Sequence, residues 1–120
     1  MINPEIISQL VDVCHRLYAR NMVTATDGNV SVRLSSGNVL TTRSGVNKGM
    51  ITQSDFVEVT ITGEKVSGNG KASTEVAMHL YVYQHRQDVN AVVHAHPTYA
   101  TGFATARIPL TQCTFPEVIV

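Results

Sequence analysis

The chain has 120 residues, of which 43% are hydrophobic and 15% are charged. This length and composition favour one globular domain with its own core and exclude a disordered chain. Nine Lys and Arg residues balance nine Asp and Glu residues, so the formal net charge at pH 7 is zero. No nucleic-acid partner is expected, because the chain lacks the long-range attraction that phosphate backbones require. Any bound anion would have to be held by local donors.

The sequence also carries no sign of a membrane or an export route. No apolar run approaches the roughly 20 residues that a spanning helix needs, so no membrane partner is expected. The first residues, MINPEIISQL, lack the basic start and apolar core of a secretory leader. Cys14 and Cys113 show no CxxC or paired spacing, so we expect reduced thiols. These features predict a cytoplasmic protein.

The first predicted element is an amphipathic helix. Asn3, Pro4 and Glu5 combine a capping residue, a proline suited to the first turn, and an acid near the positive end of the helix dipole. Apolar side chains then recur every three or four residues, at Ile7, Leu10, Val11, Cys14, Leu17 and Tyr18. This spacing places Cys14 on the buried face. His15 lies beside the apolar stripe and is expected to be structural or at the surface.

Strands dominate the next part of the chain. Residues 30–34 alternate between apolar and polar side chains, which predicts a half-buried strand. Residues 35–38 form a turn, and residues 39–42 form the returning strand of a hairpin. Residues 56–61 alternate again and lead into a turn at 62–65. The pattern is typical of an antiparallel sheet.

Helices and a buried strand follow. A second helix is expected to open at residues 71–75, with Val76, Leu80 and Tyr83 along one side. Residues 91–96 resemble a buried strand, and residues 98–107 are expected to be helical. Strand pairs flanked by helices predict either an α+β fold or an α/β fold, the latter a three-layer α/β/α sandwich with a mostly antiparallel central sheet. We treat residues 1–120 as one domain.

Two histidines end the buried strand, in the stretch VVHAHP. Side chains two residues apart on a strand share a face, so His94 and His96 project together while Ala95 points away. Two such imidazoles can both reach one metal ion, and Pro97 stops the strand beside them. From these residues alone, a metal site and an ordinary polar strand end remain equally open.

A carboxylate is expected in the first turn of the second helix. Glu75 lies where the helix dipole favours a negative charge, so dipole compensation explains it without any chemistry. A metal site that moves protons would also need such a fixed carboxylate. His79, one turn further on, could hold Glu75, face the site or lie at the surface, and we do not predict it as a ligand.

Three polar turns are candidates for anion binding: Gly28-Asn29, Ser44-Gly45 and Ser73-Thr74. Glycine lets backbone N–H groups approach an anion closely, and a helix N-terminus adds free donors. Each turn alone is more typical of an ordinary cap or loop. Together with the histidine pair and Glu75, they predict a phosphate pocket. No Walker-type glycine loop is present, so a nucleotide is not expected.

Four motifs in this order resemble the class II aldolase/adducin family, closest to its L-fuculose-1-phosphate aldolase branch. They are GNVSVR at 28–33, TRSG at 42–45, STE at 73–75 with His79 and Tyr83 following, and AVVHAHP at 91–97. The resemblance runs through essentially the whole chain. It implies an α/β/α fold, a bound Zn²⁺, and a homotetramer with active sites at subunit interfaces.

The resemblance also implies roles for individual residues. His94 and His96 would be two zinc ligands, and Glu75 the proton-transferring residue that also touches zinc in the absence of substrate. The substrate phosphate would be held by Gly28, Asn29, Ser44, Gly45, Ser73 and Thr74.

The implied reaction is aldol cleavage of a ketose 1-phosphate to dihydroxyacetone phosphate and an aldehyde. Zinc would act as a Lewis acid toward the substrate oxygens, and no Schiff-base lysine is required. Glu75 would return a proton to the enediolate. That role calls for a pKa of Glu75 nearer neutrality than that of a free side chain.

Two departures from the family pattern bear on this reading. The third histidine ligand expected downstream is absent, and catalytic zinc normally has three protein ligands. Residues 115–120 also resemble a strand that continues to the last residue, so we expect a truncated chain, an N-terminal portion whose independent activity is doubtful.

The second departure concerns a tyrosine. Fuculose-type aldolases carry a tyrosine soon after an Ile-Pro pair, whereas Ile108-Pro109 is followed by LTQCTF.

Several functions share this fold and remain open. A pentulose-phosphate 4-epimerase breaks the same type of bond, although the family's epimerases carry aspartate where this chain has Glu75. A dehydratase or decarboxylase acting on a related sugar phosphate is another alternative. An adducin-like interaction module would lack a working metal site, and the presence of Glu75, His94 and His96 argues against it. The sequence does not name the sugar or the aldehyde.

Overall fold

The computed structural model describes residues 2–112, so Cys113 and the strand predicted at 115–120 lie outside the described residues. Within this part of the chain, five strands form one sheet in the order β4-β3-β2-β1-β5, and all neighbours are antiparallel. The strands are β1 Asn29–Arg33, β2 Val39–Thr42, β3 Phe56–Val59, β4 Lys65–Gly68 and β5 Ala91–His94. The antiparallel sheet predicted from the alternating patterns is confirmed.

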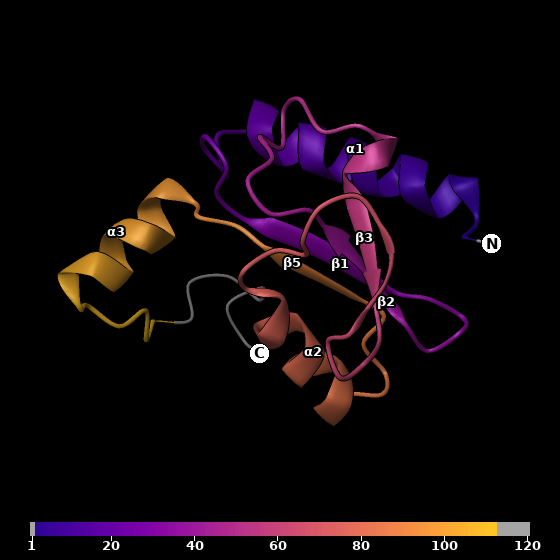
Figure 1. The fold of residues 1–120 in the computed structure, drawn as a ribbon. Coiled ribbons are helices and arrows are strands. Elements are labelled where there is room, and N and C mark those ends of the chain that lie inside the picture. The colour runs from indigo at the N-terminus through magenta and orange to yellow at the C-terminus, as the bar shows by residue number, and fades with distance from the viewer. Residues whose placement is uncertain (1, 113–120) are drawn as a thin grey trace.

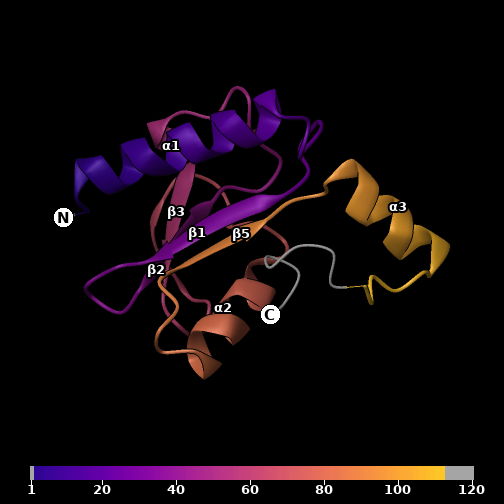
Figure 2. The same cartoon turned by 180° about the vertical axis from the view of Figure 1, so that it is seen from behind.

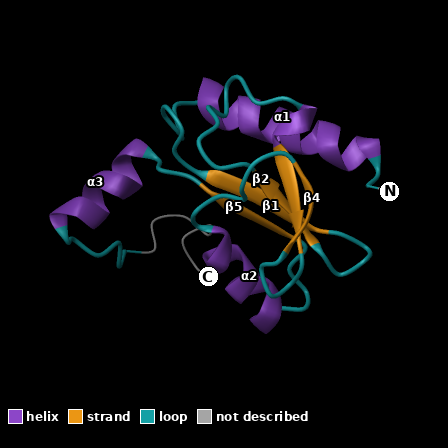
Figure 3. Ribbon diagram, viewed as in Figure 1, coloured by secondary structure: helices purple, strands orange, loops and turns teal. Residues whose placement is uncertain are grey.

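Helices lie on both sides of this sheet (Figure 1). Helix α1, Pro4–Ala19, covers one face, and α2, Val76–His85, covers the other. The reverse view in Figure 2 shows the same three layers. Helix α3, Thr98–Ala106, follows β5 and projects sideways from the layers in both views, and none of its residues is buried. The fold is the α/β/α sandwich expected from the sequence (Figure 3).

Helix α1 packs as its spacing predicted. The side chain of Asn3 accepts a hydrogen bond from the backbone N–H of Glu5 at 2.9 Å and caps the helix. Leu10 and Cys14 are buried on its inner face, in a cluster that includes side chains of β1 and β2. Burial raises the pKa of the free Cys14 thiol to about 11, so this thiol is inert at neutral pH. His15 places Nε2 2.9 Å from the carbonyl oxygen of Ile51.

A second core lies between α2 and the opposite face of the sheet. Leu80 and Tyr83 of α2 pack against Val39 of β2 and against Val57 and Val59 of β3. Side chains three and four residues apart on a helix share a face, so the predicted stripe on this helix meets the sheet. The two cores hold the helices at fixed positions relative to the strand ends.

Some element boundaries differ from those expected. Strand β5 ends at His94 rather than residue 96, because the N–H of His96 donates to the carbonyl oxygen of Met22 at 2.7 Å instead of extending the ladder. Helix α2 begins at Val76, so Glu75 is its N-cap residue rather than part of its first turn. Strand β3 ends at Val59 rather than residue 61, and a turn leads from it into β4, a strand that the sequence analysis did not predict.

Within residues 2–112, none of the helices is both long enough and apolar enough to cross a membrane.

Gly28 is required where the chain enters β1. Its φ is +72°, and a Cβ added there would lie 2.5 Å from Cγ1 of Val23 and 2.7 Å from the carbonyl oxygen of His94. Gly45 has a similar φ of +74°, but an added Cβ would meet nothing within 4 Å. The two glycines therefore differ in packing and not in backbone conformation.

We predict that Gly28→Ala destabilises the full-length protein more than Gly45→Ala does. The left-handed backbone alone costs about 1–2 kcal/mol at either position, and overpacking adds roughly 1–3 kcal/mol at Gly28 only. Denaturant unfolding of the two variants measures the difference. Equal losses of stability would contradict the close approach between Gly28 and β5.

Candidate active site

Loops and strand ends from three parts of the chain surround one cavity of about 370 Å³. The sheet explains their convergence, because β1 lies between β2 and β5 and pairs Asn29 with His94. The segment before α2 joins them through an isolated bridge between Arg43 and Ala72, and through a 3.1 Å hydrogen bond from the N–H of Ser73 to the carbonyl oxygen of Thr42. Residues far apart in the sequence therefore meet at one end of the sheet.

The cavity wall contains every residue predicted to hold phosphate, together with Glu75 and one of the two histidines. These residues are Gly28, Asn29, Ser44, Gly45, Ser73, Thr74, Glu75 and His96. The other histidine, His94, contacts this wall through Glu75. The structure thus brings the predicted site residues together, while their roles stay predictions.

The rings of His94 and His96 lie next to each other at the end of strand β5. The ring centroids of His94 and His96 are 4.9 Å apart in an edge-to-face arrangement, although only His94 belongs to the strand. Nδ1 of His94 lies 3.0 Å from Oε2 of Glu75, and Nδ1 of His96 lies 3.6 Å from Oδ2 of Asp27. A carboxylate on one ring nitrogen is the arrangement that orients histidine for a metal on the other nitrogen.

The chemistry of these donors fits zinc, but they are too few for a complete site. Within residues 2–112, no group of three or more His, Cys, Asp or Glu side chains is arranged to hold a metal ion. Two imidazoles could provide two of the three protein ligands that catalytic zinc normally has. His94 and His96 are therefore the residues in this part of the chain that could hold the metal.

Glu75 is fixed by two hydrogen bonds although its side chain is 47% exposed. Its Oε2 atom accepts from Nδ2 of Asn29 at 2.5 Å and lies 3.0 Å from Nδ1 of His94. The hydrogen bond from Asn29, and secondarily the nearby histidines, lower the pKa of Glu75. The expectation of a raised pKa is therefore wrong for this arrangement of side chains, because donors to the carboxylate outweigh its modest desolvation.

His79 lies in the interior and not at the surface. It is fully buried, with Nε2 2.5 Å from Oδ1 of Asn29 and Nδ1 2.6 Å from Oγ of Ser31. Its link to Glu75 runs through Asn29. Burial lowers the pKa of His79 to about 4, with a smaller effect of His94 in the same direction and an opposing effect of Glu75. The ring is therefore neutral at pH 7.

Two cationic side chains also line the cavity, and the sequence analysis missed both. Lys48 is only 2% exposed, and its ammonium group donates to the carbonyl oxygens of Thr26 and Val46 at 3.1 and 3.0 Å. Arg43 donates from Nε and Nη2 to Oδ1 of Asp55 at 3.2 and 2.7 Å. A lysine in a polar glycine loop looks solvated in the sequence, and only the packing of that loop shows that Lys48 turns inward.

Comparison with known proteins identifies the family. The Class II Aldolase and Adducin N-terminal domain matches residues 8–119. The chain is 41% identical over 93 residues to methylthioribulose-1-phosphate dehydratase of Gluconobacter oxydans, covering 78% of this chain and 45% of that protein. It is 35% identical over 99 residues to L-fuculose phosphate aldolase of Methanococcus maripaludis, covering 82% of this chain and 53% of that protein.

Solved structures agree with this assignment. A structure of L-fuculose 1-phosphate aldolase superposes with a TM-score of 0.84 at 36% identity, covering 92% of this chain and 52% of that one. The chain therefore belongs to the class II aldolase and adducin family, as the motifs indicated. It spans about half the length of the curated relatives it matches.

We predict that His79 makes the protein lose stability on mild acidification. Below about pH 6.5 a histidine in the unfolded chain takes up a proton, whereas folded His79 stays neutral down to about pH 4. The unfolded state then binds more protons, so stability falls as the pH decreases through this window. Between pH 7 and pH 5 the effect is on the order of 1 to 2 kcal/mol.

Unfolding of the full-length protein at both pH values tests this expectation. His79→Gln removes the titrating ring and should flatten the pH dependence by that amount. The matched control is His85→Gln, which changes an exposed histidine on the same helix and should leave the slope unchanged. A His79→Gln variant with the wild-type slope would contradict the prediction.

Proposed function

We propose that the full-length protein is a zinc-dependent lyase that cleaves a ketose 1-phosphate, similar to L-fuculose 1-phosphate, into dihydroxyacetone phosphate and an aldehyde. The observation that carries the proposal is the 3.0 Å contact between Glu75 and His94, at the wall of a cavity lined by hydroxyl groups and cations. Membership of the aldolase family and similarity to L-fuculose phosphate aldolases support it.

Donors that suit a phosphate group line the cavity, whose wall also includes the carboxylates of Asp27 and Glu75. The hydroxyl groups of Ser44, Ser73 and Thr74 line it, beside Lys48 and Arg43. Cationic and hydroxyl residues around one cavity favour a phosphate through local contacts, even though the whole chain has no net charge. The proposed phosphate site therefore includes Lys48 and Arg43 in addition to the residues predicted from the sequence.

Glu75 and the two histidines would act at the sugar end of the substrate. When bound by His94, His96 and a further ligand outside the described residues 2–112, zinc would supply Lewis-acid stabilisation of charge on the substrate oxygens. Glu75 would hold and return a proton, and its contact with His94 supports this role. Asn29 donates to the Oε2 atom that also contacts His94 and holds that carboxylate in place.

The test is product analysis with the full-length protein and its zinc content. We expect one zinc per chain, and release of dihydroxyacetone phosphate from L-fuculose 1-phosphate. His94→Ala and His96→Ala should lose zinc and activity together while the fold, measured by circular dichroism, is retained. Full zinc content in both variants would overturn the ligand assignment, and a wild-type protein without zinc would favour an adducin-like interaction module.

A second candidate is dehydration of a methylthioribulose 1-phosphate-like substrate. The 41% identity to methylthioribulose-1-phosphate dehydratase favours it. So does the sequence after Ile108-Pro109, which has no tyrosine. The same product assay separates the two reactions. Aldol cleavage splits the substrate into two smaller molecules, whereas dehydration leaves its carbon skeleton intact.

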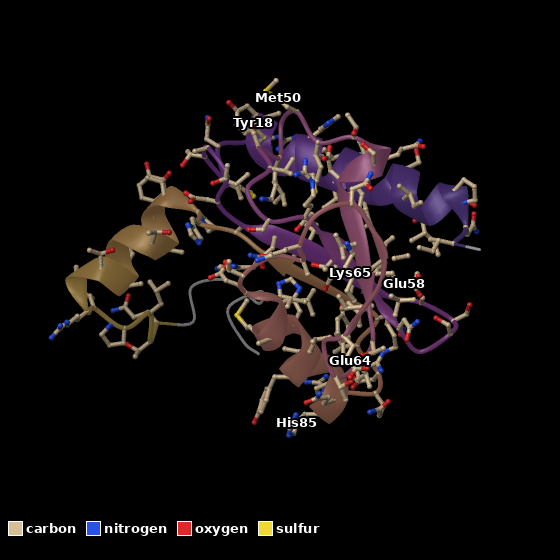
Figure 4. The ribbon with its side chains drawn as sticks, in the orientation of Figure 1. Tyr18, Met50, Glu58, Glu64, Lys65 and His85 are labelled. Atoms are coloured by element: carbon tan, nitrogen blue, oxygen red, sulfur yellow. The ribbon has the colours of Figure 1, made fainter. Side chains whose placement is uncertain are left out.

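Glu75→Gln should lower kcat while leaving zinc content and KM little changed, because the amide keeps the shape but cannot carry the proton. Loss of a positioned acid–base group lowers the rate by about 10²- to 10⁴-fold. The control is Glu64→Gln, because Glu64 (Figure 4) is an exposed glutamate at the turn before β4 and does not line the cavity. Undiminished turnover of Glu75→Gln would exclude Glu75 as the proton carrier.

A further inference from the structure

A chain of buried side chains runs inward from Glu75 between β1 and α2. Nδ2 of Asn29 contacts Glu75, and Oδ1 of Asn29 lies 2.5 Å from Nε2 of His79. Nδ1 of His79 lies 2.6 Å from Oγ of Ser31, which lies 2.8 Å from the hydroxyl of Tyr83. Asn29 is 3% exposed, and the next three side chains are fully buried.

The spacing of these residues explains how they meet. Asn29 and Ser31 are two residues apart on β1 and therefore point to the same face of the sheet. His79 and Tyr83 are four residues apart on α2 and therefore lie on one side of the helix. The polar side chains of one strand thus face those of one helix across the second core.

The hydrogen bonds in this chain have a single consistent direction. Asn29 offers its NH₂ group to the oxygen of Glu75, so its carbonyl oxygen faces His79 and must receive a proton donor. Neutral His79 then carries its proton on Nε2, which leaves Nδ1 as an acceptor for the hydroxyl of Ser31. Ser31 in turn accepts from the hydroxyl of Tyr83. Every donor points toward Glu75.

We propose that His79 is a positioning residue for the reaction: it fixes the amide of Asn29 in the orientation that donates to Glu75 and so holds the proton carrier beside His94. This inference rests on the proposed function of Glu75. Without the Nε2 proton of His79, the buried carbonyl oxygen of Asn29 loses its donor, and Glu75 alone is left to orient the amide. A flipped amide would place its carbonyl oxygen against the carboxylate and displace Glu75 from His94.

Substrate binding would depend less on this chain of hydrogen bonds than turnover does. His79 does not line the cavity, whereas the hydroxyl groups and cations that would hold the phosphate do. Misplacing a proton carrier therefore lowers kcat with little change in KM. Loss of a partner that orients a catalytic group costs about 10- to 100-fold in activity.

Two amide substitutions at position 79 separate this role from simple packing. In His79→Gln the side-chain amide reaches the place of Nε2 and can still donate to Asn29. In His79→Asn the shorter side chain reaches only the place of Nδ1, near Ser31. We expect His79→Asn to lower kcat by about 10- to 100-fold with KM within about threefold, and His79→Gln to restore most of kcat.

The test measures the kinetics of the full-length enzyme, with L-fuculose 1-phosphate and methylthioribulose 1-phosphate as probes. Zinc content and melting temperature are measured for the same variants. Equal kcat for the two variants, or a loss of kcat that follows the loss of stability, would overturn the proposal. His85→Asn and His85→Gln are the matched controls, because His85 lies at the far end of α2, away from the sheet (Figure 4), and both should retain wild-type kcat.

A measurement that needs no turnover tests the direction of these hydrogen bonds. In the ¹⁵N spectrum of the histidine rings of the full-length protein, the signals missing from His79→Gln belong to His79. We expect them to show a proton on Nε2 alone, because the carbonyl oxygen of Asn29 accepts from that nitrogen. A proton on Nδ1 in the wild type would overturn the proposal. A correct tautomer in a protein inactive on both probes would refute the proposed function and leave the hydrogen-bond chain standing.

Discussion

The antiparallel pairing of β1 with β5 is the constraint on which the site depends. It places Asn29 directly opposite His94, so the residue that orients Glu75 and the histidine that contacts Glu75 are held in register by backbone hydrogen bonds. Gly28 makes this pairing possible, because any larger residue would collide with the carbonyl oxygen of His94. The geometry of the cavity is therefore set by the sheet and not by flexible loops alone.

Cationic side chains line the cavity although the chain as a whole has no net charge. Lys48 is held inside by carbonyl oxygens and has a lowered pKa, chiefly because it is buried, and Arg43 is held by Asp55. Neutral carbonyl groups therefore hold the ammonium group of Lys48 without a direct ion pair, while the carboxylates of Asp27 and Glu75 act on it through space. A chain with no net charge can in this way place a cationic side chain at the wall of a cavity.

The sequence predicted those features that follow from local periodicity. The helix stripe with Cys14, the hairpin of β1 and β2 and the buried face of α2 are all consequences of side-chain spacing, and the structure confirms them. Features set by contacts between distant segments were missed. The inward turn of Lys48, the burial of His79 and the lowered pKa of Glu75 each depend on partners 20 or more residues away, which no local pattern encodes.

The buried polar chain between β1 and α2 is costly compared with an apolar core of the same shape. Polar groups lose hydration on burial, and their hydrogen bonds with one another only roughly offset that loss. Packing alone would therefore be served as well by apolar residues at Ser31 and His79, in line with the valines and leucine nearby. A fully satisfied chain specifies a single arrangement, however, since each member accepts from one neighbour and donates to the next. Because these hydrogen bonds end at Glu75, they fix the position of its carboxylate at the wall of the cavity. This positioning gives a reason for polar side chains in the interior of this fold.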